Sequence, residues 1–533
     1  MTIEAEADEA KSTRRPRRLA WSTAIFAAAT GLSRVLGLVR EIIVRKYFGV
    51  EGAGINAFTV AFQVPNLVRA LAADMALGAA FVPVFSELLD KGERSRAWRV
   101  ASTFLWLTVL VLGAVTGIFM LIAPWVMGLF GYGELAADLA RVLFPVVLFM
   151  GVSGVVVGIL NSYDEFAIPA LMPVLWNLAI IVSLVVFVPR FESVEAQLYV
   201  YAGGILAGTI IQAITPVWWL RGRDGRIRAV LDLRDPAVKR ILMLMLPVTL
   251  GVGLINFNLV INMFFAARFV DKNLAPSAID AAFRIYMLPQ GMFSVAVATV
   301  LFPRLSRLAS RNDIVGFRET VSLGLRQIGF LLLPASAIGA VLAVPVTRLL
   351  YERGAFDADE TQVVAAALAA FSLGLTFNGT MLMLNRAFFS LQSAWVPTAV
   401  ALGNLALNIM LNAALYRVGV WGIPLATSIV NIAGTAALLV FIRGRLGRID
   451  GRALASSYAR IIAASAAAAG VAFAVWYGLD ELLGRSLGGQ IVSVGTAVLV
   501  GAAAYLGLAA LIRVRELQTL LSLRRRSATT TEE

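Results

Sequence analysis

Residues 30–49 read TGLSRVLGLVREIIVRKYFG, an apolar stretch of helical length that carries Arg34 and Arg40 in its interior. About 20 predominantly apolar residues are enough for a helix to cross a bilayer. A charge near the bilayer centre costs about 2.5–3.5 kcal/mol on insertion scales, so ionisable residues at that depth usually face a water-filled cavity and a partner. The stretch therefore predicts a membrane helix beside a cavity that attracts an anionic ligand.

The rest of the chain has the composition of an all-α polytopic membrane protein. Of its 533 residues, 59% are hydrophobic and 15% are charged, and the mean hydropathy is +0.81, whereas soluble chains carry roughly 25% charged residues. Cysteine and histidine are both absent, which excludes disulfides, thiol catalysis and histidine-based metal sites. We expect no metal and no cofactor.

Apolar windows predict 14 transmembrane helices. They lie at 21–48, 54–87, 100–124, 134–160, 168–189, 196–220, 238–268, 275–306, 315–346, 361–390, 396–416, 419–443, 456–478 and 489–512. An even number of crossings puts both termini on one side. Loops and tails on that side hold 29 Lys and Arg residues, against 9 in the opposite loops, a set to which we assign Arg45.

This charge asymmetry predicts cytoplasmic termini by the positive-inside rule. The net charge of +13 then needs no nucleic-acid partner. The N-terminal segment lacks a short apolar region followed by a small-residue cleavage site, so we expect no removable signal peptide.

An internal repeat divides the spans into two sets of six. FVPVFSE (81–87) resembles LFPRLSR (301–307), and two proline pairs, Pro65 with Pro289 and Pro169 with Pro397, have nearly the same separation. Repeats of six helices insert in the same orientation, which predicts two pseudo-symmetric lobes around a central cavity with the substrate at their interface. The expected parts are a basic tail (1–20), an N-lobe (21–220), an amphipathic linker (221–237), a C-lobe (238–443), two extra helices (444–512) and a basic tail (513–533).

Four arginines are the candidate substrate-binding residues: Arg34 and Arg40 in span 1, Arg69 in span 2 and Arg284 in span 8. The planar guanidinium suits phosphate because it forms bidentate, charge-assisted hydrogen bonds. Candidate ion-pair partners are Glu41, Asp74 and Asp280, and pairing within the bundle is the structural alternative to a net positive cavity.

Three residues are candidate hinges: Gly37, Pro65 and Pro289. Arg34 and Arg40 are six positions apart and would not share a face of a straight helix, but a bend at Gly37 could bring both toward one cavity. Pro65 lies one turn before Arg69 and Pro289 lies five residues after Arg284, as in the broken helices of transporters.

Other polar residues favour structural roles. Arg141, Arg326, Arg386 and Arg460 lie near predicted span ends and can reach the interface or pair locally. Asn404, Asn408 and Asn412 form an i, i+4, i+8 stripe that favours helix–helix contact over an ion site. The D-x-D pattern at Asp357 and Asp359 fits a helix start, with Asp357 as N-cap and Glu360 three residues later.

Six motifs, taken together, resemble the MurJ (MviN) family of lipid II flippases, in the multidrug/oligosaccharidyl-lipid/polysaccharide exporter superfamily. They are LSRVLGLVREIIVRKYFG (32–49), AFTVAFQVPNLVRALAAD with AAFVPVFSELL, FRIYMLPQGMFSVAVATVLFPRLSR, LLYERGAFDADET, RAFFSLQSAWVP and GIPLATSIVN. The resemblance covers essentially all the predicted spans.

This resemblance implies export of lipid II, the undecaprenyl-diphosphate-linked peptidoglycan precursor, across the bacterial cytoplasmic membrane by alternating access. It implies no enzymatic step, a polyprenyl-tail groove at the last two helices, and the cell-wall synthesis machinery as a partner beside membrane lipids. The family's cavity arginines match Arg34, Arg40, Arg69 and Arg284, and its acidic residue matches Glu41.

The chain departs from the family pattern at two places. Asn56 stands where an aspartate is common, which puts a carboxylate gate in doubt, and spans 7 and 11 offer asparagines where some members bind sodium through acids. Alternatives remain a flippase for another polyprenyl-diphosphate glycan, an exporter of cationic drugs, a polytopic glycosyltransferase or ligase, and a non-transporting scaffold. A drug exporter would present carboxylates, a glycosyltransferase would need a catalytic base on a sizeable outer loop, and a scaffold would need cytoplasmic domains.

Overall fold

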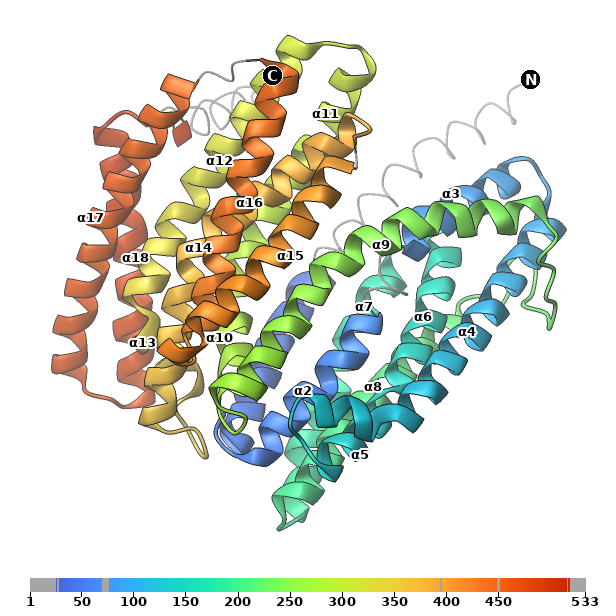
Figure 1. The fold of residues 1–533 in the computed structure, drawn as a ribbon, viewed down its shortest axis with the longest axis horizontal. Coiled ribbons are helices and arrows are strands. Elements are labelled where there is room, and N and C mark those ends of the chain that lie inside the picture. The colour runs from blue at the N-terminus through green and yellow to red at the C-terminus, as the bar shows by residue number, and fades with distance from the viewer. Residues whose placement is uncertain are drawn as a thin grey trace, which may run out of the picture. The chain divides into compact units, whose positions relative to one another are not determined.

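The computed structural model describes residues 25, 28–69, 76–393, 395–447, 451–514 and 516–517, and the regular elements in this part of the chain are all helices (Figure 1). The prediction of an all-α protein is confirmed. Eleven helical segments of the described residues are long and apolar enough to cross a membrane. The expected first, second and seventh spans are not among them, so the count of 14 stays a prediction.

A first helix, whose described part includes 28–48, precedes the labelled elements. These are α2 (Ala53–Arg69), α3 (Ala76–Asp90), α4 (Arg94–Leu129), α5 (Glu134–Leu143), α6 (Pro145–Ser162), α7 (Ala167–Val182), η2 (Ser183–Phe187), η3 (Val188–Arg190), α8 (Val194–Trp218), α9 (Pro236–Phe265), η4 (Ala266–Val270), α10 (Ala275–Pro289), η5 (Gln290–Ser294), α11 (Val295–Ser310), α12 (Ile314–Val341), α13 (Ala343–Tyr351), α14 (Ala358–Ser390), α15 (Trp395–Leu415), η6 (Tyr416–Val418), α16 (Gly422–Leu446), α17 (Gly451–Leu483) and α18 (Leu487–Leu511).

Two expected spans are each divided into two helices. The helix expected over 134–160 breaks at the buried Phe144, and Pro145 is the first residue of α6. Proline lacks an N–H and fits the first turn of a helix, which explains why a new helix begins there. The helix expected over 315–346 also breaks, at the buried Leu342 between α12 and α13, but here no proline stands at the first helical position.

The chain forms two compact units. Unit 1 comprises Met1–Phe48 and Gly52–Met263, and unit 2 comprises Gly49–Glu51 and Phe264–Glu533. Most of α9, which we assigned to the second lobe, therefore lies in unit 1. Three residues of the loop between the first two helices belong to unit 2 although both neighbouring helices belong to unit 1.

The core of unit 1 lies between α3, α4, α6 and the start of α9. The rings of Phe81 and Phe85 stack at 5.3 Å, Phe81 also stacks on Phe104 at 5.5 Å, and Trp98 packs edge-on against Phe85. These four aromatic side chains are at most 3% exposed. Burying an aromatic side chain of this size contributes about 1.5–3 kcal/mol, so this cluster is a large part of what holds α3 and α4 together.

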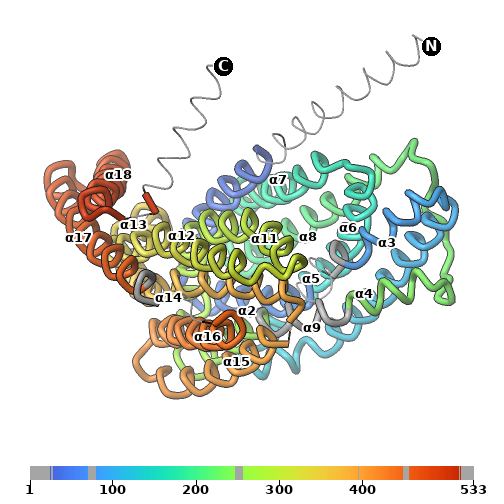
Figure 2. Tube along the Cα trace, turned by 90° about the horizontal axis from the view of Figure 1, so that it is seen from above, coloured from blue at the N-terminus to red at the C-terminus, as the bar shows by residue number. Residues whose placement is uncertain are grey.

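Unit 2 is built around α14, which packs against α10, α12 and α16 and is the most buried of the candidate spans. The α17–α18 hairpin, red in Figures 1 and 2, packs against α12 and α13. Two ion pairs hold it in place: Arg348 with Asp480 at 3.5 Å, and Arg326 with the buried Glu516 at 3.6 Å. Arg326 thus has the structural role expected of it.

The linker contains no helix between Trp218 and Pro236 and instead lies along α4. The N–H of Arg228 donates to Ser102 Oγ and the N–H of Asp232 donates to Thr103 Oγ1, both at 3.0 Å. Trp106 Nε1 in turn donates to the carbonyl of Arg228 at 3.0 Å. These bonds give hydrogen-bond partners to backbone N–H and C=O groups of a non-helical segment. The linker is therefore packed as part of unit 1.

Arg96 fixes the end of the linker through a bidentate bond to Asp235, with Nε and Nη2 at 2.9 and 3.0 Å from the two carboxylate oxygens. This hydrogen bond to the Arg96 guanidinium holds the pKa of Asp235 below its usual range. A carboxyl group with a lowered pKa in the folded state contributes stability above its unfolded pKa of about 3.9, and that contribution is lost as the pH falls through the folded value.

We therefore expect Asp235→Asn to lower stability at pH 7 by about 1 kcal/mol, because Arg96 is partly exposed and the pair is screened. The measurement is the midpoint of thermal unfolding in detergent as a function of pH. The difference from the unaltered protein should narrow as the pH falls below about 4. Asp90→Asn, at an exposed residue of α3, is the control, and a difference that does not depend on pH would contradict the assignment.

Candidate functional site

The two arginines of the first helix have different surroundings. Arg34 is exposed, whereas Arg40 is 8% exposed. Arg40 Nη1 donates to Asn177 Oδ1 at 3.1 Å, and its guanidinium carbon lies 4.8 Å from the centre of the Trp176 ring. Arg40 is thus held by two side chains of α7, which the sequence gave us no reason to select.

Asn177 connects Arg40 to the turn of helix around Gly37. Its amide nitrogen lies 3.3 Å from the Ser33 carbonyl and 2.9 Å from the Pro173 carbonyl and donates to both. A Cβ on Gly37 would lie 3.8 Å from Asn177 Oδ1, which is ordinary contact. Gly37 therefore packs against the side-chain amide of Asn177, which binds Arg40. The helix is continuous through Gly37, and its role as a hinge stays a prediction.

The main partner of Glu41 is Arg45. Arg45 Nη2 and Nε donate to Glu41 Oε1 at 2.7 and 3.0 Å, whereas Arg40 Nη2 lies 3.9 Å from Glu41 Oε2. All three side chains are buried. Our assignment of Arg45 to an outer loop was wrong: Arg45 lies inside the helix, within the expected span 21–48, and forms a buried i, i+4 pair with Glu41. The formal charges of these three side chains sum to +1.

On α2, Pro65 is inside the helix and Arg69 is its last residue. Arg69 Nε and Nη2 both donate to Asn66 Oδ1, at 3.1 and 3.0 Å. Asp74 lies outside the described residues. Asn56 is fully buried and its Nδ2 donates to the Gly52 carbonyl at 2.9 Å. An ionised aspartate cannot donate such a bond, so the asparagine has a local function that a carboxylate would not fulfil.

In unit 2, Arg284 pairs with Asp280 one turn earlier on α10, with Nη2 at 3.2 Å from Oδ1. The Arg284 side chain keeps 37% of its surface exposed. Pro289 ends α10, and the next five residues, η5, form a π-helix before α11 begins. Proline and π-helical turns are two identifiable causes of helix kinks, so this position fits the predicted hinge.

Glu360 accepts hydrogen bonds from a distant loop, a contact that the sequence did not reveal. Asp357 caps α14 as expected, accepting from the Glu360 N–H at 2.9 Å. The Glu360 carboxylate also binds a distant part of the chain. Its Oε1 accepts from the N–H groups of Val50 and Glu51, at 2.8 and 2.6 Å, more than 300 residues away. Glu360 thus binds the three-residue loop segment to unit 2.

The asparagine stripe on α15 makes structural contacts. Asn412 Nδ2 donates to Asn408 Oδ1 at 2.9 Å, and both residues are fully buried. Asn404 packs against Gly434 of α16, where a Cβ would lie 2.4 Å from Asn404 Nδ2. Within the described residues, no cluster of three Asp, Glu, His or Cys side chains could hold a metal ion.

The candidate substrate-binding residues are four arginines, three in unit 1 and one in unit 2. The family model described as lipid II flippase MurJ matches residues 44–484. The chain belongs to the MurJ family. A MurJ-family relative, the lipid II flippase MurJ of Burkholderia cenocepacia, is 31% identical over 395 residues, which cover 72% of this chain and 75% of the relative.

Solved structures agree on the fold. A lipid II flippase MurJ in an inward closed conformation matches with a TM-score of 0.74 and 24% identity, covering 92% of this chain and 98% of that one. An inward-facing multidrug resistance transporter of the MATE family matches with a TM-score of 0.67 and 18% identity, covering 80% and 99%. The all-helical MurJ-like fold is therefore confirmed.

Proposed function

We propose that this chain moves lipid II from the inner to the outer leaflet of the bacterial cytoplasmic membrane. Membership of the MurJ family carries the proposal. Such a protein is a transporter and catalyses no chemical reaction. The charge pattern supports the same substrate class, because lipid II is anionic at its diphosphate and the membrane-depth side chains singled out here are arginines.

We propose that Arg34, Arg40, Arg69 and Arg284 hold the diphosphate during transport. Arg34 and Arg284 support direct contact, because Arg34 is an exposed residue and the Arg284 side chain keeps 37% of its surface exposed. Arg40 contacts Asn177 and Trp176. We propose that its guanidinium leaves these two side chains to bind the diphosphate. Arginine forks match phosphate oxygens in pairs.

Alternating access needs helices that bend, and Pro289 with its π-helical turn supports one hinge in unit 2. We propose Gly37 and Pro65 as the hinges of unit 1. We further propose that the α17–α18 hairpin carries the polyprenyl tail, because several side chains on its surface are large, apolar and exposed, Leu499 at 72% and Ile462 at 52% among them. Photo-crosslinking of a polyprenyl probe that labels other helices but not this hairpin would contradict the tail site.

We propose that both termini and the 221–237 linker lie in the cytoplasm and that cell-wall synthesis enzymes are partners. The Lys and Arg distribution supports the orientation, and moving Arg45 into a helix strengthens the asymmetry. In the cysteine-free chain, Glu192→Cys should react with an impermeant thiol reagent in intact cells, and Ser95→Cys should not. Both residues are exposed, so the reverse pattern would overturn the orientation.

Complementation tests the function itself. Expression of this chain in a bacterium depleted of its own MurJ should restore growth and restore lipid II to the outer leaflet, measured by enzymatic modification at the outer surface. Growth without outer-leaflet lipid II would identify a different role. Exposure of another polyprenyl-diphosphate glycan, with lipid II unchanged, would identify the alternative substrate.

A further inference from the structure

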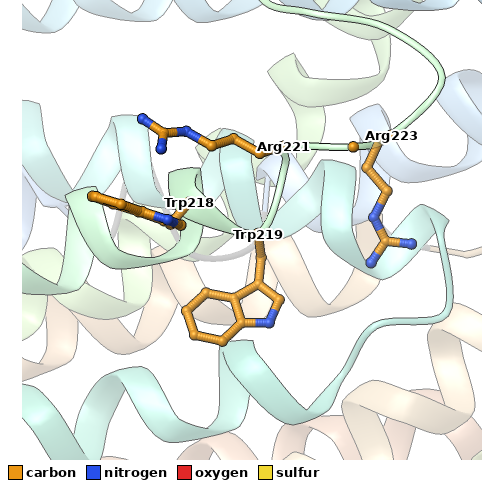
Figure 3. A pocket seen from close by; sticks show the side chains of 5 residues that line it. Trp218, Trp219, Arg221 and Arg223 are labelled. Carbon is orange, nitrogen blue, oxygen red and sulfur yellow. The ribbon is translucent and has the colours of Figure 1, made fainter.

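A pocket of basic and aromatic side chains lies where α8 passes into the linker, outside the set of residues assigned to transport. Trp218, Trp219, Arg221, Gly222 and Arg223 line this open pocket, whose volume is about 430 Å³ (Figure 3). Trp218 is 64% exposed and Trp219 is 45% exposed. Tryptophan is enriched at the depth of lipid headgroups, because the indole has an apolar ring and a polar N–H.

Arg221 is the residue of this pocket best placed to bind an anion from solution or from the membrane. It is exposed, its guanidinium carbon lies 4.2 Å from the centre of the Trp218 ring, and the close-up shows the side chain extending over that ring. Stacking of this kind orients the planar fork. Among the described residues Arg221 has no carboxylate partner, whereas Arg223 pairs with Glu165 at 3.3 Å and lies over Tyr163.

The pocket belongs to a rigid part of unit 1 that also exposes apolar side chains. Backbone N–H groups of the linker donate to Ser102 and Thr103 of α4, and Gly225 lies so close to the Trp98 ring that a Cβ there would have no room. Leu231 and Leu233 of the fixed linker are 48% and 45% exposed. The arginine and tryptophans of the pocket suit the phosphate and glycerol of a phospholipid, and the exposed leucines lie further along the same linker.

We propose that this pocket binds the phosphate of an anionic phospholipid in the cytoplasmic leaflet. Arg221 binds the phosphate oxygens, and Trp219 packs along the glycerol and the first acyl carbons. Anionic lipids of this leaflet attract basic segments next to a membrane span. The leaflet follows from the proposed orientation, and the pocket shares no lining residue with the proposed diphosphate site, so transport and lipid binding can be tested independently.

Native mass spectrometry of the full-length chain in a neutral detergent tests the site by counting bound lipids. Titration with phosphatidylglycerol should show one tightly bound lipid, and phosphatidylcholine should not replace it at the same concentration. Arg221→Gln keeps the side chain's length but removes the charge and the fork, so its affinity for this lipid should fall about tenfold. Thermal unfolding of the variant should match the unaltered protein, because Arg221 is exposed.

Arg443→Gln is the matched control and should keep the tight lipid. Arg443 is an exposed arginine at the end of α16, and among the described residues no tryptophan stacks on it. Equal phosphatidylglycerol binding by Arg221→Gln and the unaltered protein would overturn the proposal. Inorganic phosphate that displaces the lipid at equal concentration would show a site for soluble anions. Displacement by equimolar undecaprenyl diphosphate would assign the pocket to the transported lipid, and both of these results also overturn the proposal.

Discussion

Arg34→Ala is expected to lower lipid II export by about 10- to 100-fold while the protein stays folded and inserted. Hydrogen bonds to charged groups contribute about 1.5–3 kcal/mol, and each 1.4 kcal/mol is a factor of ten in affinity. Arg34 is exposed, so its removal opens no cavity in the core. Arg34→Lys keeps the charge but loses the bidentate fork and should recover part of the export.

The same measurement, outer-leaflet lipid II beside membrane abundance, separates binding from structure at the other arginines. Arg284→Ala should lose export, whereas Asp280→Asn should not, because removal of the ion-pair partner leaves the cation for the substrate. If Arg284 were only structural, both variants would be equally harmful. Normal export by Arg40→Ala and Arg284→Ala at normal abundance would refute the arginine site.

Arg141→Ala is the matched control. Arg141 is half-exposed and paired within its own helix to Asp138 at 2.5 Å, as Arg284 is to Asp280, but we assign it no role in transport. Asn177→Ala tests the positioning of Arg40. It should lower export although the arginine is still present, and Arg40→Lys should not restore export in that background.

Removal of the Glu360 carboxylate should expose the loop at residues 49–51 to solvent. This is the second large effect that we expect. Glu360→Ala leaves the N–H groups of Val50 and Glu51 without their acceptor, and a buried group left unsatisfied costs about 1–3 kcal/mol. Val50 is fully buried, so Val50→Cys should resist an impermeant thiol reagent in the parent protein and react in the Glu360→Ala background.

Glu352→Ala is the control for that experiment. Glu352 lies just before α14 and accepts from Thr361 at 2.7 Å, so its loss removes a nearby carboxylate without touching the bonds to residues 50 and 51. Gly49→Ala should reproduce the effect of Glu360→Ala. Its Cβ would lie 2.6 Å from Glu360 Oε1, and φ at Gly49 is +59°. Equal protection of the cysteine in all backgrounds would show that Glu360 does not hold the loop.

Local chemistry made much of the helical pattern and one cap predictable. Apolar windows located the helices because a membrane span must be long and apolar, and Asp357 followed by Glu360 marked a helix start. The break before Pro145 was within reach of the same rules, since proline favours a first turn. Arg45 was misplaced because it lies near the end of the expected span 21–48 and was counted with the loop that follows, although it is buried in an i, i+4 pair.

The contacts that complete the candidate site depend on tertiary structure. Asn177 and Trp176 are ordinary residues of an apolar span, and only packing brings them to Arg40, 137 residues earlier in the case of Asn177. Glu360 has the sequence of a capping residue, yet its carboxylate binds another loop. A single sequence carries no signal for either contact, because neither depends on spacing along one helix.

The loop held by Glu360 also has a consequence for biogenesis. Val50 leaves the ribosome 310 residues before Glu360, its hydrogen-bond acceptor. The first helices are therefore synthesised before the N–H groups of Val50 and Glu51 can bind Glu360. Unit 2 cannot be completed from its own continuous segment, because Gly49–Glu51 belong to it. A fragment that begins after the linker should therefore assemble an incomplete unit 2. In the full chain, the loop at residues 49–51 can bind Glu360 only after α14 has been inserted.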